Sequence, residues 1–393
     1  MSMPSGPFLR RLRLENFRSI EKCDLELRHF TILVGRNGAG KSNVLDSLRF
    51  VMESLQTSLD HALKSRGGFS EVRRRHSGHP HAFAIQLELD IENVRFGYGF
   101  EIEAKGSEGF VVKREALTSQ AASYLVSGGA IVHATSTTMP PAAEDRLYLV
   151  HAAGLPEFRG VYDHLISTGF YNLNPEEMKQ PQTADPKELL HRDGSNIASV
   201  IARLTREQKP ALDRISQYLR TIVPGITGVA HAPIGPWETL AFEQGRAGRF
   251  YAASMSDGTL RALGALVAVT QLAGAKQPVS LVGIEEPETA LHPAAVGALM
   301  DAIREATAHT QVIITSHSPD LLDQVIDEDQ LLAVQSVEGT TQVGLVDPAS
   351  REAIKDHLYT PGDLLRMDQL AVDRDDLTRQ QRSLDIFSGD GKE

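Results

Sequence analysis

The stretch FTILVGRNGAGKS, residues 30–42, decides the fold of this chain. It opens with a run of apolar and β-branched residues, 30–34, which is typical of a buried strand. A glycine-rich loop follows from Gly35 to Gly40, and residues 41–66 contain neither glycine nor proline. Apolar residues recur there at spacings of three and four, which predicts a helix over 41–66. An apolar strand, a tight loop and a helix in this order predict an α/β fold.

The loop itself indicates a phosphate-binding site. Between Gly35 and Ser42 it matches the pattern G-x-x-x-x-G-K-[ST]. Glycines let successive backbone N–H groups turn toward a phosphate at the positive end of the following helix. Lys41 would then reach the β- and γ-phosphates of a nucleotide, and Ser42 would hold Mg²⁺. A mere glycine-rich turn with an exposed lysine is the alternative, and the flanking strand and helix argue against it.

Composition excludes several protein classes. The chain has 393 residues, and its 40 Lys and Arg against 51 Asp and Glu give a net charge of −11, which argues against nonspecific coating of DNA. A single cysteine, Cys23, excludes an intramolecular disulfide framework and is typical of a reducing compartment. Residues 1–17 lack the apolar core of a secretory signal, and no apolar run approaches the roughly 18–20 residues of a membrane span. We therefore expect a cytoplasmic protein without a membrane span.

The remaining patterns predict an antiparallel β region, then helices, then a second α/β region. Strict alternation over 83–91 and 94–102 predicts a hairpin, with 110–117 as a further strand of the same sheet. Residues 127–144 are expected to form a mobile loop, and those after Arg374 a frayed tail. Further expected elements are helices over 197–208, 211–222, 260–272 and 294–308, strands over 279–284 and 311–315, and a hairpin over 331–337 and 341–346.

An acidic pair and a histidine carry candidate catalytic chemistry. The apolar residues 281–284 deliver Glu285 and Glu286 to the C-terminal end of a strand, where α/β sheets place ligands. Glu285 would bind Mg²⁺, and Glu286 would act as general base toward an attacking water. His317 follows the next strand and would bind a γ-phosphate or hold the base and the water in place. A solvated strand end and a structural histidine are the plainer alternatives.

A serine-rich helix start is the last candidate. Ser256 and Gly258 precede a helix and would offer hydroxyl and N–H donors to an anion. Taken alone, this segment also fits an ordinary helix cap. The order of the motifs along the chain therefore carries more weight than any one of them.

In that order the motifs resemble the ABC-type ATPase heads of the SMC/RecF/OLD class. The resemblance spans Leu9 to about Val346. LENFRSI (14–20) resembles the first strand turn of the class, TILVGRNGAGKSN (31–43) its P-loop, residues 255–259 its signature motif, EEPETALHP (285–293) its Walker B segment and D-loop, and IITSHSP (313–319) its switch histidine. Glu285 stands where transporters of the wider group carry Asp.

The resemblance implies an ATP-hydrolysing α/β head with an antiparallel β subdomain and a helical signature lobe. ATP and Mg²⁺ are the implied cofactors, and the head would form a homodimer through sandwiched ATP. Candidate further partners are an effector protein and DNA or RNA, and no membrane is involved. The implied ATP contacts are Arg18, Asn37, Gly38, Gly40, Lys41, Ser42, Ser256 and Gly258, the implied Mg²⁺ ligands are Ser42 and Glu285, and the implied catalytic residues are Glu286 and His317.

The chain departs from the class in two ways. The expected place of the Q-loop glutamine, residues 164–174, contains no glutamine, and Gln180 and Gln182 lie further on. The longest stretch free of glycine and proline, residues 8–34, is predicted to be β-structure, so long coiled-coil arms are excluded. What remains is similar to compact OLD-like or RecF-like ATPases, many of which act in DNA maintenance or antiphage defence, often beside a partner.

We expect four parts along the chain. These are an N-terminal ATPase lobe over 1–175, a helical lobe over 176–255, a C-terminal ATPase half over 256–346 and a partly flexible extension over 347–393. Two alternatives compete with an ATPase switch. A transporter subunit would show Asp-Glu and a clear Q-loop, and an OLD-type nuclease would need a Toprim domain.

The remaining clusters have plainer interpretations. Too few residues follow Asp373 to complete a Toprim domain, so Glu338-Gly339 is expected to be a hairpin turn and 373–376 a solvated run. Trp237 is expected in the core. The histidines 61, 76, 79 and 81 are expected on a surface loop, and the arginines 66 and 73–75 are expected to be solvated or, less favourably, to bind nucleic acid.

Overall fold

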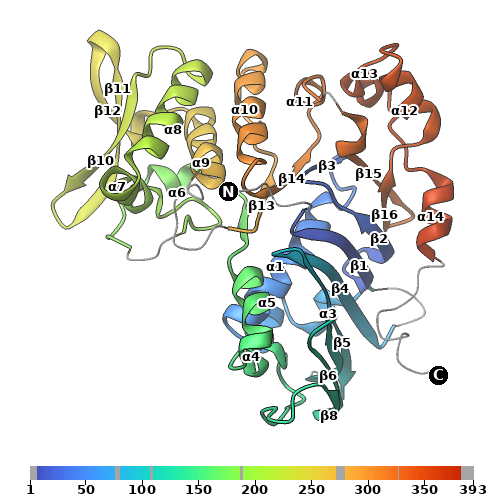
Figure 1. Ribbon diagram of the computed structural model, residues 1–393. Coiled ribbons are helices and arrows are strands. Elements are labelled where there is room, and N and C mark those ends of the chain that lie inside the picture. The colour runs from blue at the N-terminus through green and yellow to red at the C-terminus, as the bar shows by residue number, and fades with distance from the viewer. Residues whose placement is uncertain are drawn as a thin grey trace.

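One large sheet joins two kinds of β-structure in the computed structural model (Figure 1). The structure describes residues 7–75, 80–106, 109–185, 189–270, 279–325 and 327–381, apart from the side chain of Arg246. In these residues the strands are β1 (Leu9–Phe17), β2 (Ile20–Glu26), β3 (Phe30–Val34), β4 (Ala82–Ile91), β5 (Val94–Lys105), β6 (Gly109–Thr118), β7 (Ser123–Ser127), β8 (Ala130–Ala134), β9 (Gly169–Tyr171), β10 (Gly228–Ile234), β11 (Trp237–Gln244), β12 (Gly248–Tyr251), β13 (Leu281–Glu285), β14 (Gln311–Ser316), β15 (Leu331–Val337) and β16 (Thr340–Leu345).

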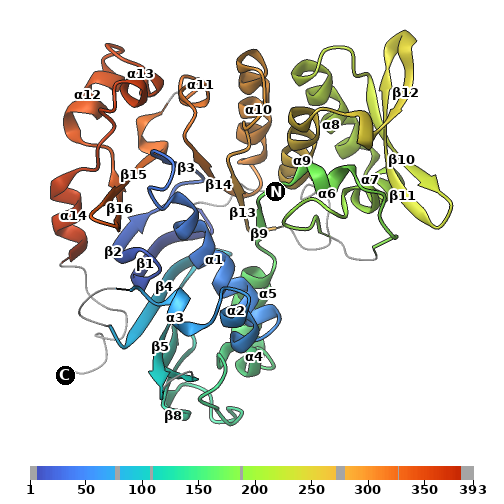
Figure 2. The ribbon, with the colours of Figure 1, turned by 180° about the vertical axis from the view of Figure 1, so that it is seen from behind.

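The helices surround this sheet (Figure 2). They are α1 (Lys41–Gln56), α2 (Leu59–Lys64), α3 (Phe69–Val72), α4 (Leu149–Ala152), α5 (Pro156–Ile166), α6 (Pro175–Lys179), α7 (Ile197–Glu207), α8 (Lys209–Ile222), α9 (Asp257–Thr270), α10 (Pro293–Ala306), α11 (Pro319–Leu322), α12 (Pro348–Lys355), α13 (Pro361–Arg366) and α14 (Arg374–Gln381). None of the described helices is long and apolar enough to cross a membrane.

The sheet has an antiparallel half and a mostly parallel half. Its order is β8-β7-β6-β5-β4-β1-β2-β16-β15-β3-β14-β13-β9. Strands β8 to β2 pair antiparallel, whereas β15, β3, β14, β13 and β9 pair parallel. The two halves meet where β2 and β16 share a single pair, Ile20 and Thr341. The C-terminal ends of the parallel strands lie at one edge, where α/β sheets bind ligands.

Two buried cores lie on opposite faces of the sheet. Side chains alternate between the faces of a strand, and β3 shows this alternation clearly. Ile32 and Val34 belong to the core under α7 to α10, whereas Leu33 belongs to the core under α1 and α5. Because both faces of β3 are covered, the strand is buried throughout and is apolar apart from Thr31.

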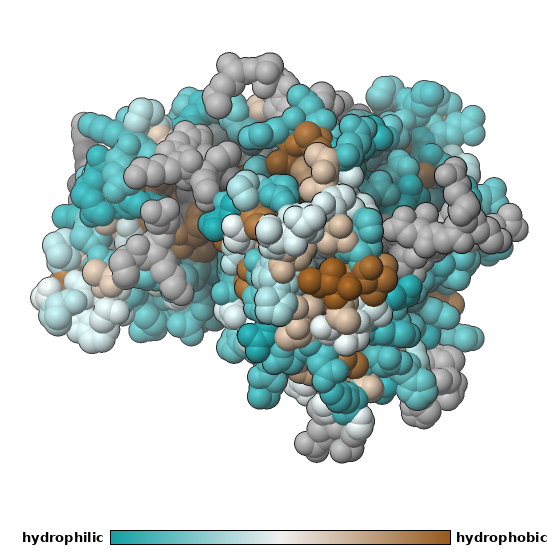
Figure 3. Space-filling view, turned by 60° about the horizontal axis from the view of Figure 1, so that its bottom comes forward, coloured by the Kyte–Doolittle hydropathy of each residue, from teal (hydrophilic) through white to brown (hydrophobic). Residues whose placement is uncertain are grey.

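A helical lobe and a C-terminal extension flank the sheet. Helices α6 to α9 and the small sheet β10-β11-β12 lie on one side of α10, and α12 to α14 lie on the other (Figures 1 and 2). Figure 3 brings the lower end of Figure 1 forward, and there the apolar residues form separate patches on a mostly hydrophilic surface.

Several secondary-structure predictions were wrong. The helix expected over 41–66 ends at Gln56, because Ser58 caps a new helix by accepting a hydrogen bond from the His61 N–H. The expected mobile loop 127–144 contains β8, which pairs with β7. The expected frayed tail contains α14, which packs on β2 and β16, and residues 382–393 lie outside the described part.

Side-chain burial corrects two further predictions. Trp237 is 48% exposed at the tip of the β10–β11 hairpin, rather than in the core. Of the arginines 66 and 73–75, only Arg75 is solvated as expected, and it pairs with Glu71. Arg66 is buried against Asp46, and Arg74 is buried with an ion pair to Glu21. These arginines hold the N-terminal lobe together, and most of their charge is already paired.

Candidate functional site

The phosphate-binding loop is fixed by residues far away in the sequence. Thr341 on β16 donates its hydroxyl to the carbonyl of Ala39 at 2.9 Å. Ser19 lies 2.7 Å from the same threonine hydroxyl and accepts a hydrogen bond from the Asn43 side chain at 2.6 Å. A Cβ at Gly40 would lie 2.0 Å from the threonine hydroxyl, and the residue has φ +102°. Glycine is therefore required at this position.

The open side of the loop fits a polyphosphate. Asn37, Gly38 and Ser42 are exposed, and a Cβ at Gly38 would meet no atom within 4 Å. The first N–H groups of α1 have no carbonyl partner within the helix and lie at its positive end. The open side of the loop therefore has N–H donors and the Ser42 hydroxyl within reach of a ligand, and phosphate binding there stays a prediction.

Lys41 is buried under the loop. Its ammonium donates to the carbonyls of Gly35 at 2.8 Å and Arg36 at 3.1 Å, and lies 3.9 Å from Glu286 Oε1. Burial lowers the pKa of Lys41, although the charges of Glu286 and Glu288 oppose this effect. The lysine thus joins the loop to the acidic strand end.

Glu286 and His317 form a hydrogen-bonded pair at the ends of β13 and β14. The register aligns Glu285 with Thr315, so the residues that follow the two strands come together. His317 Nδ1 lies 2.8 Å from Glu286 Oε1. Glu286 has φ +45°, and its N–H donates to the Thr315 carbonyl at 3.0 Å. A left-handed backbone is unusual for glutamate and aims its side chain away from the strand direction.

Sequence analysis missed Glu288 as a site residue. Its side chain is 5% exposed and accepts a hydrogen bond from Ser316 Oγ at 2.5 Å. Burial raises the pKa of Glu288, against the effect of that hydrogen bond. Its Oε2 is buried and has no hydrogen-bond partner among the described residues. The signal was present, because Glu288 follows the acidic pair by two residues, but nothing local indicates that it points inward.

The carboxylate of Glu285 forms an ion pair with an arginine that lies outside the buried core. Arg192 Nη2 lies 3.1 Å from Glu285 Oε1. Arg192 belongs to the segment before α7, and its carbonyl accepts the N–H of Asn172 at 2.9 Å, directly after β9. This is the strand end where the class pattern places a glutamine. In this chain it carries Asn172, with Arg192 beside it.

Together these groups fit Mg²⁺ and ATP. Carboxylate and hydroxyl oxygens such as those of Glu285, Glu286 and Ser42 are the ligands that Mg²⁺ prefers. The buried Glu288 Oε2 without a partner is a spare acceptor in the same acidic group. Protein groups and phosphate oxygens would have to share the metal, because the described residues contain no group of three or more His, Cys, Asp or Glu placed to hold an ion.

The signature segment lies apart from the loop of its own chain. Ser256 is exposed and accepts a hydrogen bond from the Thr259 N–H at 3.3 Å. A Cβ at Gly258 would lie 2.2 Å from the Ala290 carbonyl, so the signature helix packs tightly against the D-loop. In the described residues no hydrogen bond or ion pair joins this segment to Lys41.

Arg18 contacts α1 rather than the loop. Its Nε lies 2.7 Å from Asp46, which also pairs with Arg49 and Arg66. Burial would raise the pKa of Asp46, but hydrogen bonds and charges from the three arginines lower it to about 2. Arg18 thus anchors the turn after β1 to the P-loop helix.

The C-terminal extension borders the mouth of the site, which the sequence did not predict. A hollow of about 510 Å³ lies between the loop and α13. Arg36 of the loop pairs with Asp368 at 3.2 Å, and Arg366 pairs with Asp320 and Asp323 on and after α11. The lining residues are Arg36, Asn37, His317, Pro319, Leu365, Arg366 and Asp368. The extension therefore supports the segment that follows His317.

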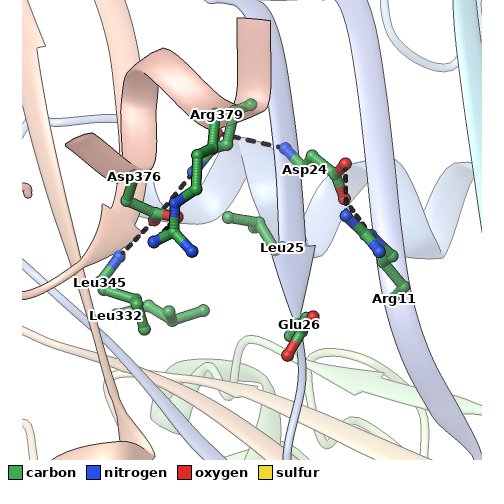
Figure 4. Close-up of a pocket in the computed structure, with 9 residues that line it drawn as sticks. Arg11, Asp24, Leu25, Glu26, Leu332, Leu345, Asp376 and Arg379 are labelled. Atoms are coloured by element: carbon green, nitrogen blue, oxygen red, sulfur yellow. Dashed lines mark hydrogen bonds and ion pairs between the residues drawn. The ribbon is translucent and has the colours of Figure 1, made fainter. Parts of the chain in front are cut away.

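A second hollow, of about 240 Å³, lies where α14 meets β2 and β16 (Figure 4). Its polar groups bind one another. Arg11 pairs with Asp24, and Arg379 with Asp376. Gln380 accepts the Asp24 N–H at 3.2 Å, and Asp376 accepts the Leu345 N–H at 2.9 Å. Side chains of α14 thus accept hydrogen bonds from backbone N–H groups of β2 and β16 that the two strands do not pair with each other. This hollow therefore has a structural role.

The two candidate nuclease segments, at Glu338 and Asp373, have structural roles. Glu338 and Gly339 form the β15–β16 turn with φ +50° and +78°. Asp373 is 5% exposed rather than solvated, and its carboxylate accepts the Asp375 N–H and pairs with Arg351. It caps α14 and is not free to bind a metal. Of the four histidines, His76 and His79 lie outside the described residues.

A family model described as "AAA domain, putative AbiEii toxin, Type IV TA system" matches residues 30–323. Among curated proteins, the chain is 38% identical over 90 residues to the chromosome partition protein Smc of Methanocaldococcus jannaschii, covering 22% of this chain and 7% of that protein. It is 43% identical over 51 residues to the OLD nuclease of Thermus scotoductus, covering 13% and 10%. The chain thus spans only a small part of these relatives.

The fold is similar to that of solved SMC heads. The SMC head bound to the C-winged helix domain of ScpA matches with a TM-score of 0.57 and 14% identity, over 86% of this chain and 97% of that chain. At this identity the match establishes the fold alone. It confirms the predicted α/β head. The sequence did not predict that the antiparallel strands continue the large sheet, or that a smaller antiparallel sheet, β10-β11-β12, forms beside the helical lobe.

Proposed function

The chain belongs to the AAA-domain family described as a putative AbiEii toxin of a type IV TA system, its relatives are SMC/RecF/OLD-class ABC-type ATPase heads, and from this premise we propose that it hydrolyses ATP with Mg²⁺. One observation carries the proposal. Lys41, Glu286 and His317 come from three separate sequence motifs, and Glu286 Oε1 lies 3.9 Å from Lys41 Nζ and 2.8 Å from His317 Nδ1 at the edge of the sheet. A structural role would not require a lysine, a glutamate and a histidine to converge beside a phosphate cradle.

Each residue has a role in this proposal. The N–H groups of 37–42 hold the β-phosphate, and Lys41 exchanges its loop carbonyls for β- and γ-phosphate oxygens. Glu286 accepts a proton from the attacking water, and His317 Nδ1–H orients that carboxylate by a hydrogen bond. Ser42 and Glu285 hold Mg²⁺, which neutralises charge on the transferred phosphoryl group.

We further propose that the active site is shared between two copies. The signature helix α9 lies on the far side of α10 from α1, the helix that begins at Lys41 (Figures 1 and 2). The exposed Ser256 hydroxyl can instead meet a γ-phosphate held by a second copy. Two-fold symmetry then creates two equal sites in one interface, with an ATP molecule in each site. The four-part division at residues 175, 255 and 346 stays a prediction, and its third part, 256–346, carries the signature residues together with Glu286 and His317.

The cellular role is a further proposal. We infer antiphage defence or DNA maintenance in the cytoplasm, with an effector protein or nucleic acid as partner. The family description names a toxin, and the similar proteins include a chromosome partition protein and an OLD nuclease. The single cysteine is consistent with a reducing compartment. Identification of nucleic acid or protein that copurifies with the chain would test this role.

Phosphate release tests the enzymatic proposal. The wild-type chain should release phosphate from ATP with Mg²⁺ and not with EDTA. Glu286→Gln keeps the size of the side chain but cannot accept the proton, so turnover should fall at least about a hundredfold while ATP still binds. Glu157→Gln, an exposed change on α5, is the matched control and should keep the wild-type rate. Wild-type turnover in Glu286→Gln would contradict the assignment of the base.

A further inference from the structure

We propose that Arg192 is a positioning residue. Its ion pair with Glu285 holds the signature helix of the helical lobe against the core, and metal at Glu285 weakens this pair. This inference rests on the proposed function and adds a residue that none of the sequence motifs includes. Arg192 and Glu285 are 93 residues apart, and their side chains are joined at 3.1 Å. Glu285 is 19% exposed and Arg192 is 45% exposed, so the pair is accessible to solvent and can be broken.

The neighbouring cation cannot take over this role. Arg49 on α1 lines the same small cavity as Arg192 and Glu285, but it pairs with Asp46 and Glu53. The Arg192 guanidinium and a Mg²⁺ ion at Glu285 would be two cations beside one carboxylate, so their charges would repel each other. Metal at Glu285 therefore competes with Arg192, which must then move away or share the carboxylate with the metal.

Movement of Arg192 would be transmitted by its backbone. The N–H groups of Asn172 and Asn174 donate to the carbonyls of Arg192 and Asp193, both at 2.9 Å. These four residues form a short ladder between β9 and the segment that leads into α7. The ladder ties the side chain at Glu285 to the backbone beside β9.

That ladder touches the signature helix. A Cβ at Gly264 on α9 would lie 2.8 Å from the side chain of Leu173, which is the residue between Asn172 and Asn174. At the start of the same helix, Asp257 pairs with Lys179 of α6 at 2.8 Å. Continuous contacts thus run from Glu285 through Arg192 and Leu173 to the helix that carries Ser256 and Gly258. Loss of the Arg192–Glu285 pair would loosen the signature helix from the core.

Hydrogen exchange without nucleotide is the first test. Arg192→Ala and Glu285→Ala should each raise the exchange of a peptide covering 171–175 by about fivefold, and the double variant should raise it no further. Arg192→Lys keeps the charge and should stay near the wild-type rate. Arg214→Ala is the matched control, because it breaks another Arg–Glu pair between the helical lobe and α10. Wild-type exchange in Glu285→Ala would overturn the proposal.

Mg²⁺ with a non-hydrolysable ATP analogue is the second test. Binding of both should raise exchange at 171–175 in the wild type to the level of Arg192→Ala, and add nothing in that variant. The Mg²⁺ concentration for half-maximal analogue binding should fall about fivefold in Arg192→Ala and return toward wild type in Arg192→Lys. Analogue binding without either change would overturn the proposal. If the wild type binds no analogue, the proposed function fails, and the first test alone decides the role of Arg192.

Discussion

The carboxylate of Glu286 lies 2.8 Å from the imidazole of His317, Oε1 to Nδ1. Only one imidazole nitrogen faces the carboxylate, so the other is free to face a phosphate or a water. The pair therefore gives His317 a defined tautomer, with its proton on Nδ1 when the ring is neutral. Glu286 is therefore the candidate base, and His317 is the residue that orients it.

His317→Ala should slow turnover without weakening nucleotide binding. Glu286 would keep its backbone position, because its N–H donates to the Thr315 carbonyl, but its side chain would lose orientation. We expect ATP hydrolysis to fall by about 10²-fold and the affinity for a non-hydrolysable analogue to change less than about threefold. His164→Ala on α5 is the control and should leave both values unchanged. An equal loss of turnover and affinity in His317→Ala would show that His317 acts in binding instead.

Lys41→Ala should act on binding first. The ammonium is the buried cation of the loop, and removing it leaves the charge of a triphosphate unpaired there. We expect affinity for ATP to fall at least about tenfold, measured by titration with a fluorescent analogue. Lys64→Ala, an exposed lysine on α2, should not change it. An unchanged affinity in Lys41→Ala would place the phosphates elsewhere.

The sequence predicted the parts of this site that local patterns specify. The glycine-rich loop, Glu286 and His317 each follow an apolar strand, and parallel strands bring their C-terminal ends together. It did not predict Arg192, because the pair with Glu285 depends on the path of the chain between β9 and α7. Nor did it predict the exposed Trp237, because exposure depends on where the β10–β11 hairpin projects.

The docking of α14 should contribute to stability. Gln380 is 3% exposed, donates to the Val343 carbonyl at 3.0 Å and accepts the Asp24 N–H. Gln380→Leu keeps the bulk but leaves both strand groups unpaired, which should cost about 2 kcal/mol in urea denaturation. Arg379→Ala removes only an exposed ion pair and should cost less than about 0.5 kcal/mol. Equal stability of Gln380→Leu and the wild type would contradict the role of α14 at this seam.

Glu115 should make stability depend on pH. It is fully buried between the hydroxyls of Tyr98 and Tyr124 and the N–H groups of Tyr148 and Leu149. Burial raises its pKa from 4.5 to about 7, against the effect of these hydrogen bonds. Because the folded chain keeps the proton longer, the contribution is full below about pH 4.5 and is lost as the pH rises through 7.

The loss from Glu115 should amount to about 3–4 kcal/mol, which is the shift of 7 − 4.5 times about 1.4 kcal/mol. Glu115→Gln removes the titrating group, so urea denaturation of this variant should show a smaller fall in unfolding free energy between pH 5 and 7.5. Glu157→Gln should keep the slope of the wild type. Identical slopes in all three chains would mean that Glu115 does not titrate in this range.

Mixing two inactive variants should restore activity if the active site is shared. Lys41→Ala damages the loop half, and Ser256→Arg damages the signature half, which lies apart from it. A mixed dimer then has one site with two damaged halves and one with two intact halves. Random pairing makes half of the dimers mixed, so up to about a quarter of wild-type activity should return.

A second mixture is the matched control for the shared site. Lys41 and Glu286 lie 3.9 Å apart in one chain, so they belong to the same half. Every site in a mixed dimer of Lys41→Ala and Glu286→Gln therefore contains one damaged loop half, and no activity should return. Subunit exchange, measured by energy transfer between labelled chains, must be shown in both mixtures. If the first mixture stays inactive while its subunits exchange, each copy completes its own site, and Ser256 does not cross to the partner.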